Sequence, residues 1–103
     1  MHTAVFRFSF DEDVNLIEAE ATLQLAILAA EGLLGESRVR MEFSYHLDAP
    51  RAALLVDGST ASGDAIVRIY TAFLSREFVS DRFAVRRMSS PATASVPKTG
   101  VAA

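Results

Sequence analysis

Residues 3–34 decide the fold, and they read TAVFRFSFDEDVNLIEAEATLQLAILAAEGLL. In residues 3–10 apolar and polar side chains alternate, which predicts a half-buried strand whose phenylalanines face the core. Three acidic residues follow at 11–13, where the free N–H groups at the start of a helix favour carboxylates. The sequence therefore predicts a strand that leads directly into a long helix.

That helix is expected to begin at Asp13 as its N-cap and to extend to about residue 30 or 32, with Gly32 or Gly35 able to end it. It carries two apolar stripes, whereas a surface helix needs only one. The first stripe is Leu16, Leu23, Ile27, Ala30 and Leu34, and the second is Val14, Ile17, Ala21, Leu25 and Leu28. One stripe covers a sheet, and the other needs the second helix or another subunit to cover it. The spacing does not decide which is exposed; we take the second stripe as the candidate oligomer interface.

Two further strands are expected in the middle of the chain. Residues 38–47 alternate, with Val39, Met41, Phe43, Tyr45 and Leu47 directed inward and Arg38, Arg40, Glu42, Ser44 and His46 outward. Such alternation is typical of an antiparallel sheet with one free face. A turn at residues 48–51 leads to a strand at residues 52–57, so the two strands are predicted to form a hairpin.

The remaining elements complete a βαββαβ order. The turn residues 57–64 end the hairpin and start another amphipathic helix, and a last strand is expected over residues 82–88. We predict an α+β protein with the ferredoxin-like plan, in which two helices cover one face of a four-stranded antiparallel sheet of order 4-1-3-2. Residues 1–88 form this single domain, and residues 89–103 are expected to be a disordered tail. Another arrangement of the same elements, or a hairpin swapped in a dimer, stays open.

The 103-residue chain is half apolar and has no cysteine. Its length suits one core without disulfides, and the lack of cysteine excludes a thiolate nucleophile and a cysteine-ligated zinc site. The sequence has no signal-peptide pattern and no apolar run of the roughly 20 residues that span a bilayer. We therefore expect a soluble cytoplasmic protein with no membrane partner.

Charge is distributed unevenly along the chain. Residues 1–37 hold seven acidic side chains and one arginine, whereas residues 38–88 hold eight arginines and six acidic side chains. The outward sheet face is expected to carry Arg7, Arg38, Arg40 and Arg86. This face is a candidate surface for an anionic partner. Sheets of this plan that bind RNA carry aromatic side chains on the outer face, whereas the phenylalanines here are predicted to face inward, so nucleic acid is not the expected partner.

Polar residues offer two candidate sites. The candidate ligand-binding or anion-binding set is Arg7, Arg40, His46, Asp57 and Arg86. The hydroxyl-rich turn at residues 58–63 could hold a phosphate on free N–H groups, but helix capping explains the same residues. Neither histidine has a second histidine or a cysteine near it, so we expect no metal, no cofactor and no catalytic residues.

We interpret the chain as a non-enzymatic interaction or regulatory module that associates with itself, with another protein as a second candidate partner. The two-striped helix, the mixture of apolar side chains and arginines on the outer sheet face, and the lack of a convergent catalytic set favour this. Two alternatives stay open. One is a small-ligand-binding regulator or enzyme with a pocket between subunits, and the other is nucleic-acid binding through the arginine-bearing face.

Overall fold

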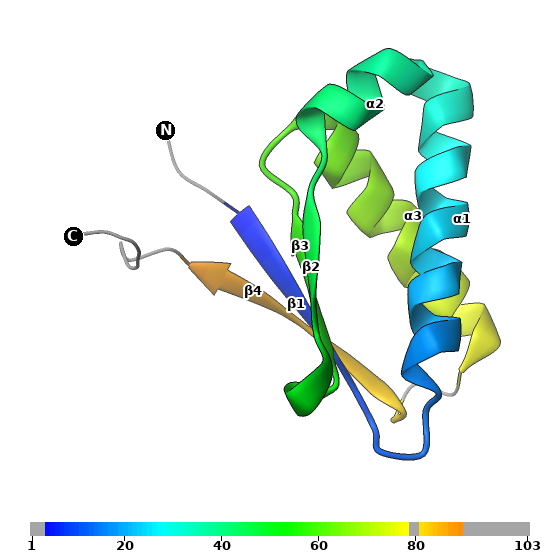
Figure 1. Ribbon diagram of the computed structural model, residues 1–103, viewed down its shortest axis with the longest axis vertical. Helices are drawn as coiled ribbons and strands as arrows, with labels where there is room; N and C mark the ends of the chain where they lie inside the picture. Colours follow the sequence, from blue (N-terminus) through cyan, green and yellow to red (C-terminus); the bar gives the residue numbers. More distant parts are fainter. Residues whose placement is uncertain (1–3, 79–80, 90–103) are drawn as a thin grey trace.

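A computed structural model describes residues 4–78 and 81–89 of the chain (Figure 1). Within these residues the elements are β1 (Ala4–Phe10), α1 (Leu16–Leu34), α2 (Glu36–Glu42), β2 (Tyr45–Asp48), a 3-10 turn (Ala49–Arg51), β3 (Ala53–Asp57), α3 (Ala61–Glu77) and β4 (Phe83–Ser89). The strands form one antiparallel sheet in the order β2-β3-β1-β4, which reads 4-1-3-2 from the other edge. Helices α1 and α3 lie on one side of this sheet. The predicted α+β class and four-stranded antiparallel sheet are confirmed, but the part of the chain described has three α-helices where two were expected.

The phenylalanines of β1 form the floor of the core, as predicted. Phe8 and Phe10 are buried. Phe8 pairs in register with Leu54 of β3 and Val85 of β4, and Tyr70 of α3 packs on it with ring centroids 4.8 Å apart. The core therefore lies between the central strands and the two long helices.

The first helix begins later than predicted and ends at one of the two glycines that were predicted to stop it. Its N-cap is Asn15, whose side chain accepts hydrogen bonds from two backbone N–H groups of the first turn, so the prediction of Asp13 was wrong. The helix extends to Leu34 and ends at Gly35, which has a φ of +98°, a conformation that favours glycine. Gly32, the other predicted stop, lies inside the helix.

Residues 38–47 do not form one strand, which corrects the prediction. The first half of this segment belongs to α2, and only its second half reaches the sheet as β2. The alternation of apolar residues does not match their burial, because Val39 is buried whereas Met41 is 87% exposed. The outward strand positions assigned to Arg38 and Arg40 are therefore wrong as well.

Helix α2 is stabilised by pairs of charges one turn apart. Arg38 pairs with Glu42 at 3.3 Å, and Arg40 pairs with Glu36 at 2.7 Å. Such i,i+4 pairs add a small stabilisation to an exposed helix. Because the backbone turns sharply at Gly35, this short helix returns the chain from the end of α1 to the sheet.

The second half of the fold matches its sequence pattern. The predicted hairpin forms, but between β3 and a first strand shortened to β2. The last strand forms as expected, and β4 pairs with β1 along all seven residues. The strand extends to Ser89, one residue beyond the predicted domain boundary, and the rest of the predicted tail lies outside the described residues, as does His2. Among the helices in residues 4–78, none combines the length and apolarity needed to cross a membrane.

Candidate binding surfaces

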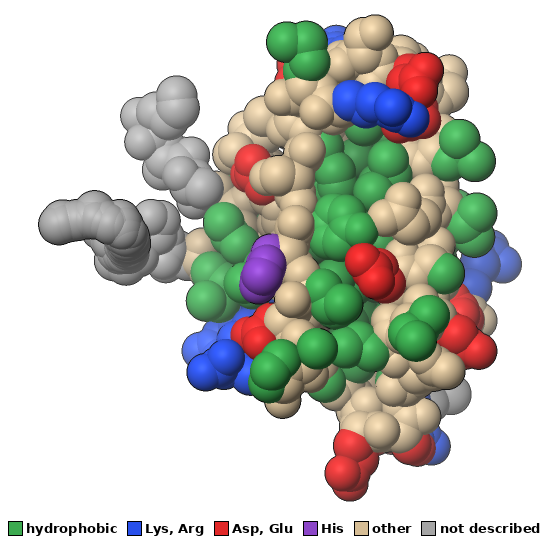
Figure 2. Space-filling view, viewed as in Figure 1, with side chains coloured by type: hydrophobic (Ala, Val, Ile, Leu, Met, Phe, Trp, Pro, Cys, Tyr) green, Lys and Arg blue, Asp and Glu red, His purple; other side chains and the backbone are tan. Residues whose placement is uncertain are grey.

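The exposed side of α1 is apolar, and we call Ile17, Ala21, Leu25 and Leu28 the α1 face. Ile17 is 79% exposed, Leu25 58% and Leu28 63%. Ala21 is exposed. Val14, the fifth residue of the predicted stripe, lies before the N-cap of α1 and packs against the core, so its assignment to the exposed stripe was wrong. In Figure 2, hydrophobic side chains follow the right-hand margin of the molecule, where Figure 1 places α1. Three large aliphatic side chains thus lie in solvent on one line of one helix.

The first apolar stripe of α1 is the one that contacts the core. Leu23 and Ala30 are fully buried, and Leu16, Ile27 and Leu34 are partly buried against the core. Helix α3 packs along this side, where the small residues of α1 permit a close approach. Helix α3 and the sheet therefore cover the first stripe. The described residues leave the second stripe uncovered.

A groove with a volume of about 450 Å³ opens between α1, α2 and β2. It is lined by Gln24, Ile27, Glu31, Val39, Arg40, Phe43, Ser44 and Tyr45. Figure 2 shows hydrophobic side chains gathered in this central region of the surface. Because Gln24 and Ile27 neighbour residues of the α1 face along the helix, the groove continues that face toward the edge of the sheet.

One wall of the groove is fixed by Tyr45 of β2. Its hydroxyl donates to Glu20 at 2.9 Å and accepts from Gln24 at 2.7 Å. Burial raises the pKa of Tyr45, and the hydrogen bond to Glu20 raises it further. The phenol is therefore protonated at neutral pH and holds the edge strand against α1.

The predicted ligand-binding set is only partly brought together. Arg7 and Arg86 lie directly opposite each other on β1 and β4. His46 is in the same row across the sheet, but Leu55 separates it from Arg7. Arg40 lies on α2, where it pairs with Glu31 at 3.6 Å as well as with Glu36. Two of the four arginines predicted for the outer face are thus elsewhere.

Asp57 belongs to the outer face, but its carboxylate is hydrogen-bonded to the turn that follows β3. Its carboxylate accepts hydrogen bonds from the backbone N–H of Ser59 at 3.0 Å and from the Ser59 hydroxyl at 2.6 Å. In the register of the sheet it lies opposite Val5, two residues along from Arg7. Its clear role is to shape the turn after β3.

A third arginine joins the pair on β1 and β4. Arg7, Arg86, Arg87 and Met88 line an open depression of about 300 Å³, and we call the three arginines the arginine cluster. Neighbouring residues of a strand point to opposite faces, so Arg86 and Arg87 approach this depression from the two sides of the edge strand. Arg87 was not among the predicted binding residues, although two consecutive arginines on a strand were a visible signal.

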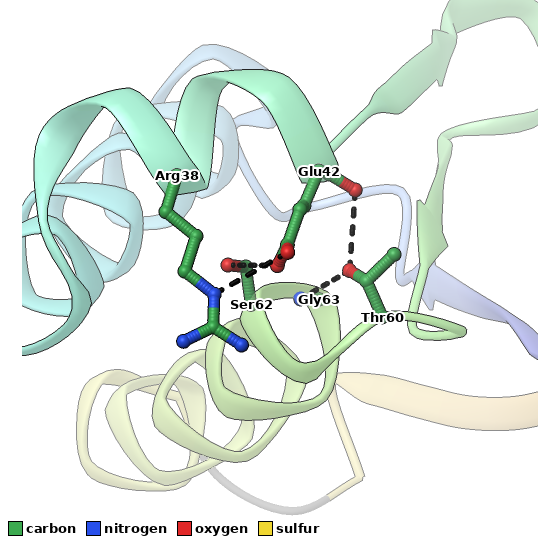
Figure 3. A network of polar contacts seen from close by, with 5 residues as sticks. All are labelled: Arg38, Glu42, Thr60, Ser62 and Gly63. Atoms are coloured by element: carbon green, nitrogen blue, oxygen red, sulfur yellow. Dashed lines mark hydrogen bonds and ion pairs between the residues drawn. The ribbon is translucent and has the colours of Figure 1, made fainter.

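The hydroxyl-rich turn before α3 caps the helix, and its hydroxyl groups bind the protein's own Glu42 (Figure 3). Thr60 accepts from the N–H of Gly63 at 3.0 Å and donates to the backbone carbonyl of Glu42 at 3.1 Å. The buried Ser62 hydroxyl donates to the Glu42 carboxylate at 2.7 Å, and Arg38 donates to its other oxygen at 3.3 Å. The capping interpretation explains these contacts without a bound phosphate.

The contacts of Glu42 change its acidity. The hydrogen bond from Ser62 lowers the pKa of the Glu42 carboxyl, and Arg38 lowers it further, while desolvation acts in the opposite direction. Gly63 is required by packing in the same turn, because a Cβ there would lie 2.1 Å from the carbonyl oxygen of Asp57. The turn therefore joins α2, β3 and α3.

The acidic segment after β1 pairs with an arginine. Asp11 lies 3.7 Å from Arg82, and Asp13 also forms an ion pair with Arg82, so the loop before α1 is tied to the start of β4. Within residues 4–78 and 81–89 no three histidine, aspartate or glutamate side chains are grouped in a way that could hold a metal ion.

Comparisons with known proteins add no information on function. Neither a family model, nor a curated protein, nor a solved structure matches the chain.

Proposed function

We propose that the protein is a non-enzymatic interaction module that forms a homodimer through the α1 face. The observation that carries this proposal is the exposure of Ile17, Leu25 and Leu28 on one line of α1, next to a groove that continues the apolar surface. Contiguous apolar surface of this kind marks interaction sites in folded domains. The line from Ile17 to Leu28 is about 17 Å long at 1.5 Å per residue.

A second copy of the chain is the occupant that fits this face best. The α1 face contains no charged residue, so two copies can bury it against each other without stranding an unpaired charge. An antiparallel two-fold pairing centred between Ala21 and Leu25 sets the large Leu25 of each copy against the small Ala21 of the other. In the same arrangement Glu18 meets the uncharged residues 28–29 rather than another carboxylate. Two-fold dimers are also the commonest oligomers.

The adjoining groove increases the area available to such a dimer. A specific interface buries about 800 Å² on each partner, more than one line of side chains supplies. Phe43 and Tyr45 at the edge of the sheet extend the apolar surface beyond the helix. We expect the second copy to cover both the α1 face and the near side of the groove.

Two expectations accompany this proposal. We infer that the fold is a ferredoxin-like variant in which α2 is added after the first helix, and the strand order and the two covering helices support this assignment. The cytoplasm is our expected location, because a chain without cysteine gains nothing from an oxidising compartment.

The test is the solution mass by light scattering on a size-exclusion column. We expect the full chain to have twice its 11.2 kDa mass. Leu25→Glu and Leu28→Glu should each give folded monomer, because a carboxylate buried without a partner costs several kcal/mol, roughly 100-fold or more in the dissociation constant.

Met41→Glu is the matched control, since it introduces the same charge at an exposed apolar position on a different helix. It should leave the dimer intact. A full chain that is monomeric, or dimers that persist in both α1 variants, would overturn the proposal. Circular dichroism and thermal unfolding of each variant separate loss of association from loss of folding.

A further inference from the structure

We propose that the arginine cluster binds the phosphate group of a small phosphomonoester. Arg7 and Arg86 lie on the sheet face opposite α1 and α3, whereas Arg87 belongs to the other face of the edge strand β4. This inference does not depend on the proposed dimer. Arg7, Arg86 and Arg87 all line one open depression beside β1 and the edge strand β4. Guanidinium is suited to this task because its planar fork donates two parallel hydrogen bonds to a phosphate.

Repulsion between the like charges of the cluster destabilises the sheet, and a bound anion would reduce this repulsion. Arg7 and Arg86 are a directly opposed cross-strand pair. Like charges in that position destabilise a sheet, and Arg87 adds a third positive charge to the same depression. A dianion bound between the three side chains would turn this repulsion into attraction.

None of the aspartate and glutamate side chains in the described residues lies within ion-pair distance of the cluster. All 13 aspartate and glutamate side chains of the chain lie within the described residues. The five arginines that pair with them at 4.0 Å or less are Arg38, Arg40, Arg51, Arg68 and Arg82. Of the four that remain, three form the cluster, whereas Arg76 lies apart on α3. The positive charge is thus concentrated where no acidic side chain meets it.

Asp57 is the acidic residue of the outer face that lies near Arg7 in the register. It is two residues along the sheet from Arg7 and accepts both of its hydrogen bonds from Ser59. Arg7 instead donates to the hydroxyl of Ser9 at 3.3 Å, a neutral acceptor on its own strand. This contact orients the Arg7 side chain without neutralising it.

The size of the site favours one phosphate on a small molecule over a nucleic acid. A volume of about 300 Å³ suits a compact ligand, and Met88 supplies an apolar wall for its organic part. A nucleic acid needs basic groups spaced along its backbone. Arg38 and Arg40, which would have extended the surface, are instead held in ion pairs on α2.

Thermal unfolding of the full chain with phenyl phosphate tests the proposal, with sodium chloride at equal ionic strength as the reference. We expect phenyl phosphate at several times its dissociation constant to raise the melting temperature by roughly 5 °C. The double variant Arg7→Gln with Arg86→Gln should lose this shift. In chloride alone it should melt at or above the temperature of the unmodified chain, because the like-charge pair is gone.

The matched control is Arg51→Gln with Arg68→Gln, which removes two charges that are paired elsewhere. This variant should keep the full shift. No shift in the unmodified chain, or an equal shift in the Arg7 and Arg86 double variant, would overturn the proposal. A third measurement uses a single-stranded oligonucleotide. The proposal would be overturned in favour of nucleic acid if the oligonucleotide bound more tightly than phenyl phosphate and its affinity fell with salt as steeply as contacts to several phosphates require.

Discussion

The hydroxyl of Tyr70 on α3 donates a hydrogen bond of 2.7 Å to the backbone carbonyl of Ala19 on α1. Both residues are fully buried, and the ring of Tyr70 also packs on Phe8 at the centre of the sheet. One side chain therefore contacts both long helices and the central strand. This contact lies on the side of α1 that packs against α3 and the sheet, and the second apolar stripe lies on the side that faces solvent.

Tyr70→Phe is expected to lower the free energy of unfolding by about 1 kcal/mol. The ring would keep its packing on Phe8, so only the hydrogen bond to Ala19 is removed. Urea unfolding of the two proteins measures the difference. A fall of several kcal/mol would contradict this prediction, since it would mean that the ring itself had moved.

The same tyrosine should make the protein sensitive to alkali. Burial raises the pKa of Tyr70 far above its ordinary value of 10.0. A group whose pKa is raised by folding contributes stability that is present below the unfolded pKa and is lost as the pH rises above it. The free energy of unfolding should therefore fall from about pH 10 upward.

Comparing this alkaline fall in the unmodified chain and in Tyr70→Phe isolates the contribution of one phenol. The variant should show a shallower slope. Tyr45→Phe is the comparison variant, because the pKa of Tyr45 is also raised but its hydroxyl lies in the exposed groove. Equal slopes in the unmodified chain and Tyr70→Phe would contradict the prediction.

Two glycines should respond in opposite ways to alanine. Gly63→Ala places a Cβ 2.1 Å from the carbonyl oxygen of Asp57, so β3 and α3 must separate, and we expect a loss of about 3 kcal/mol or more. Gly32→Ala adds a methyl group with nothing within 4 Å inside α1, and should gain up to about 1 kcal/mol. Chemical denaturation of both variants provides the test. Similar effects in the two would show that the close approach at Gly63 does not constrain the fold.

The sequence was sufficient for the elements that have one strong pattern. The alternating phenylalanines of β1 and the apolar spacing of α3 both predicted elements that formed as expected. In residues 38–43 two patterns compete: apolar side chains alternate as in a strand, while Arg38 with Glu42 and Glu36 with Arg40 have helical spacing. The helix formed because Gly35 turns the chain and only Val39 needs burial. Alternation with a period of two residues could not reveal that choice.

The sequence alone did not predict which candidate surfaces are exposed, because exposure depends on contacts between residues far apart in the chain. The α1 face was identified as one of two stripes, but its exposure depends on how α1 packs against α3 and the sheet. The placement of Arg7 and Arg86 on one outer face was predicted from the sequence, whereas their direct opposition depends on the register of β1 and β4. Arg40 was misplaced together with α2, and the involvement of Arg87 depends on the shape of the sheet edge. Local periodicity does not contain that information.

The start of α1 offers a comparison between two adjacent capping candidates. Asn15→Ala removes the acceptor for two backbone N–H groups and should cost about 1 kcal/mol of stability. Asp13→Ala removes an exposed ion pair with Arg82, which is worth less than about 1 kcal/mol. High salt should weaken the effect of Asp13→Ala and leave that of Asn15→Ala nearly unchanged. A larger, salt-independent loss for Asp13→Ala would identify it as the cap after all.

Glu42 should set part of the protein's response to acid. Hydrogen bonding from Ser62 holds the pKa of Glu42 below its ordinary value of 4.5. A carboxyl whose pKa is lowered by folding contributes stability above the unfolded pKa, and this contribution is lost as the pH falls through the folded pKa. Glu42→Gln should therefore be less stable than the unmodified chain at neutral pH, and the difference should shrink below about pH 4.5.

Glu36→Gln is the matched control, because Glu36 lies on the same helix and pairs with Arg40 at a more exposed position. Its stability difference should be smaller at neutral pH. Ser62→Ala should shift the acid transition in the same direction as Glu42→Gln, since the buried hydroxyl is the largest cause of the lowered pKa. A difference for Glu42→Gln that stays constant from neutral pH into the acid range would mean that the carboxylate contributes through its shape alone, and that its charge does not join α2 to α3.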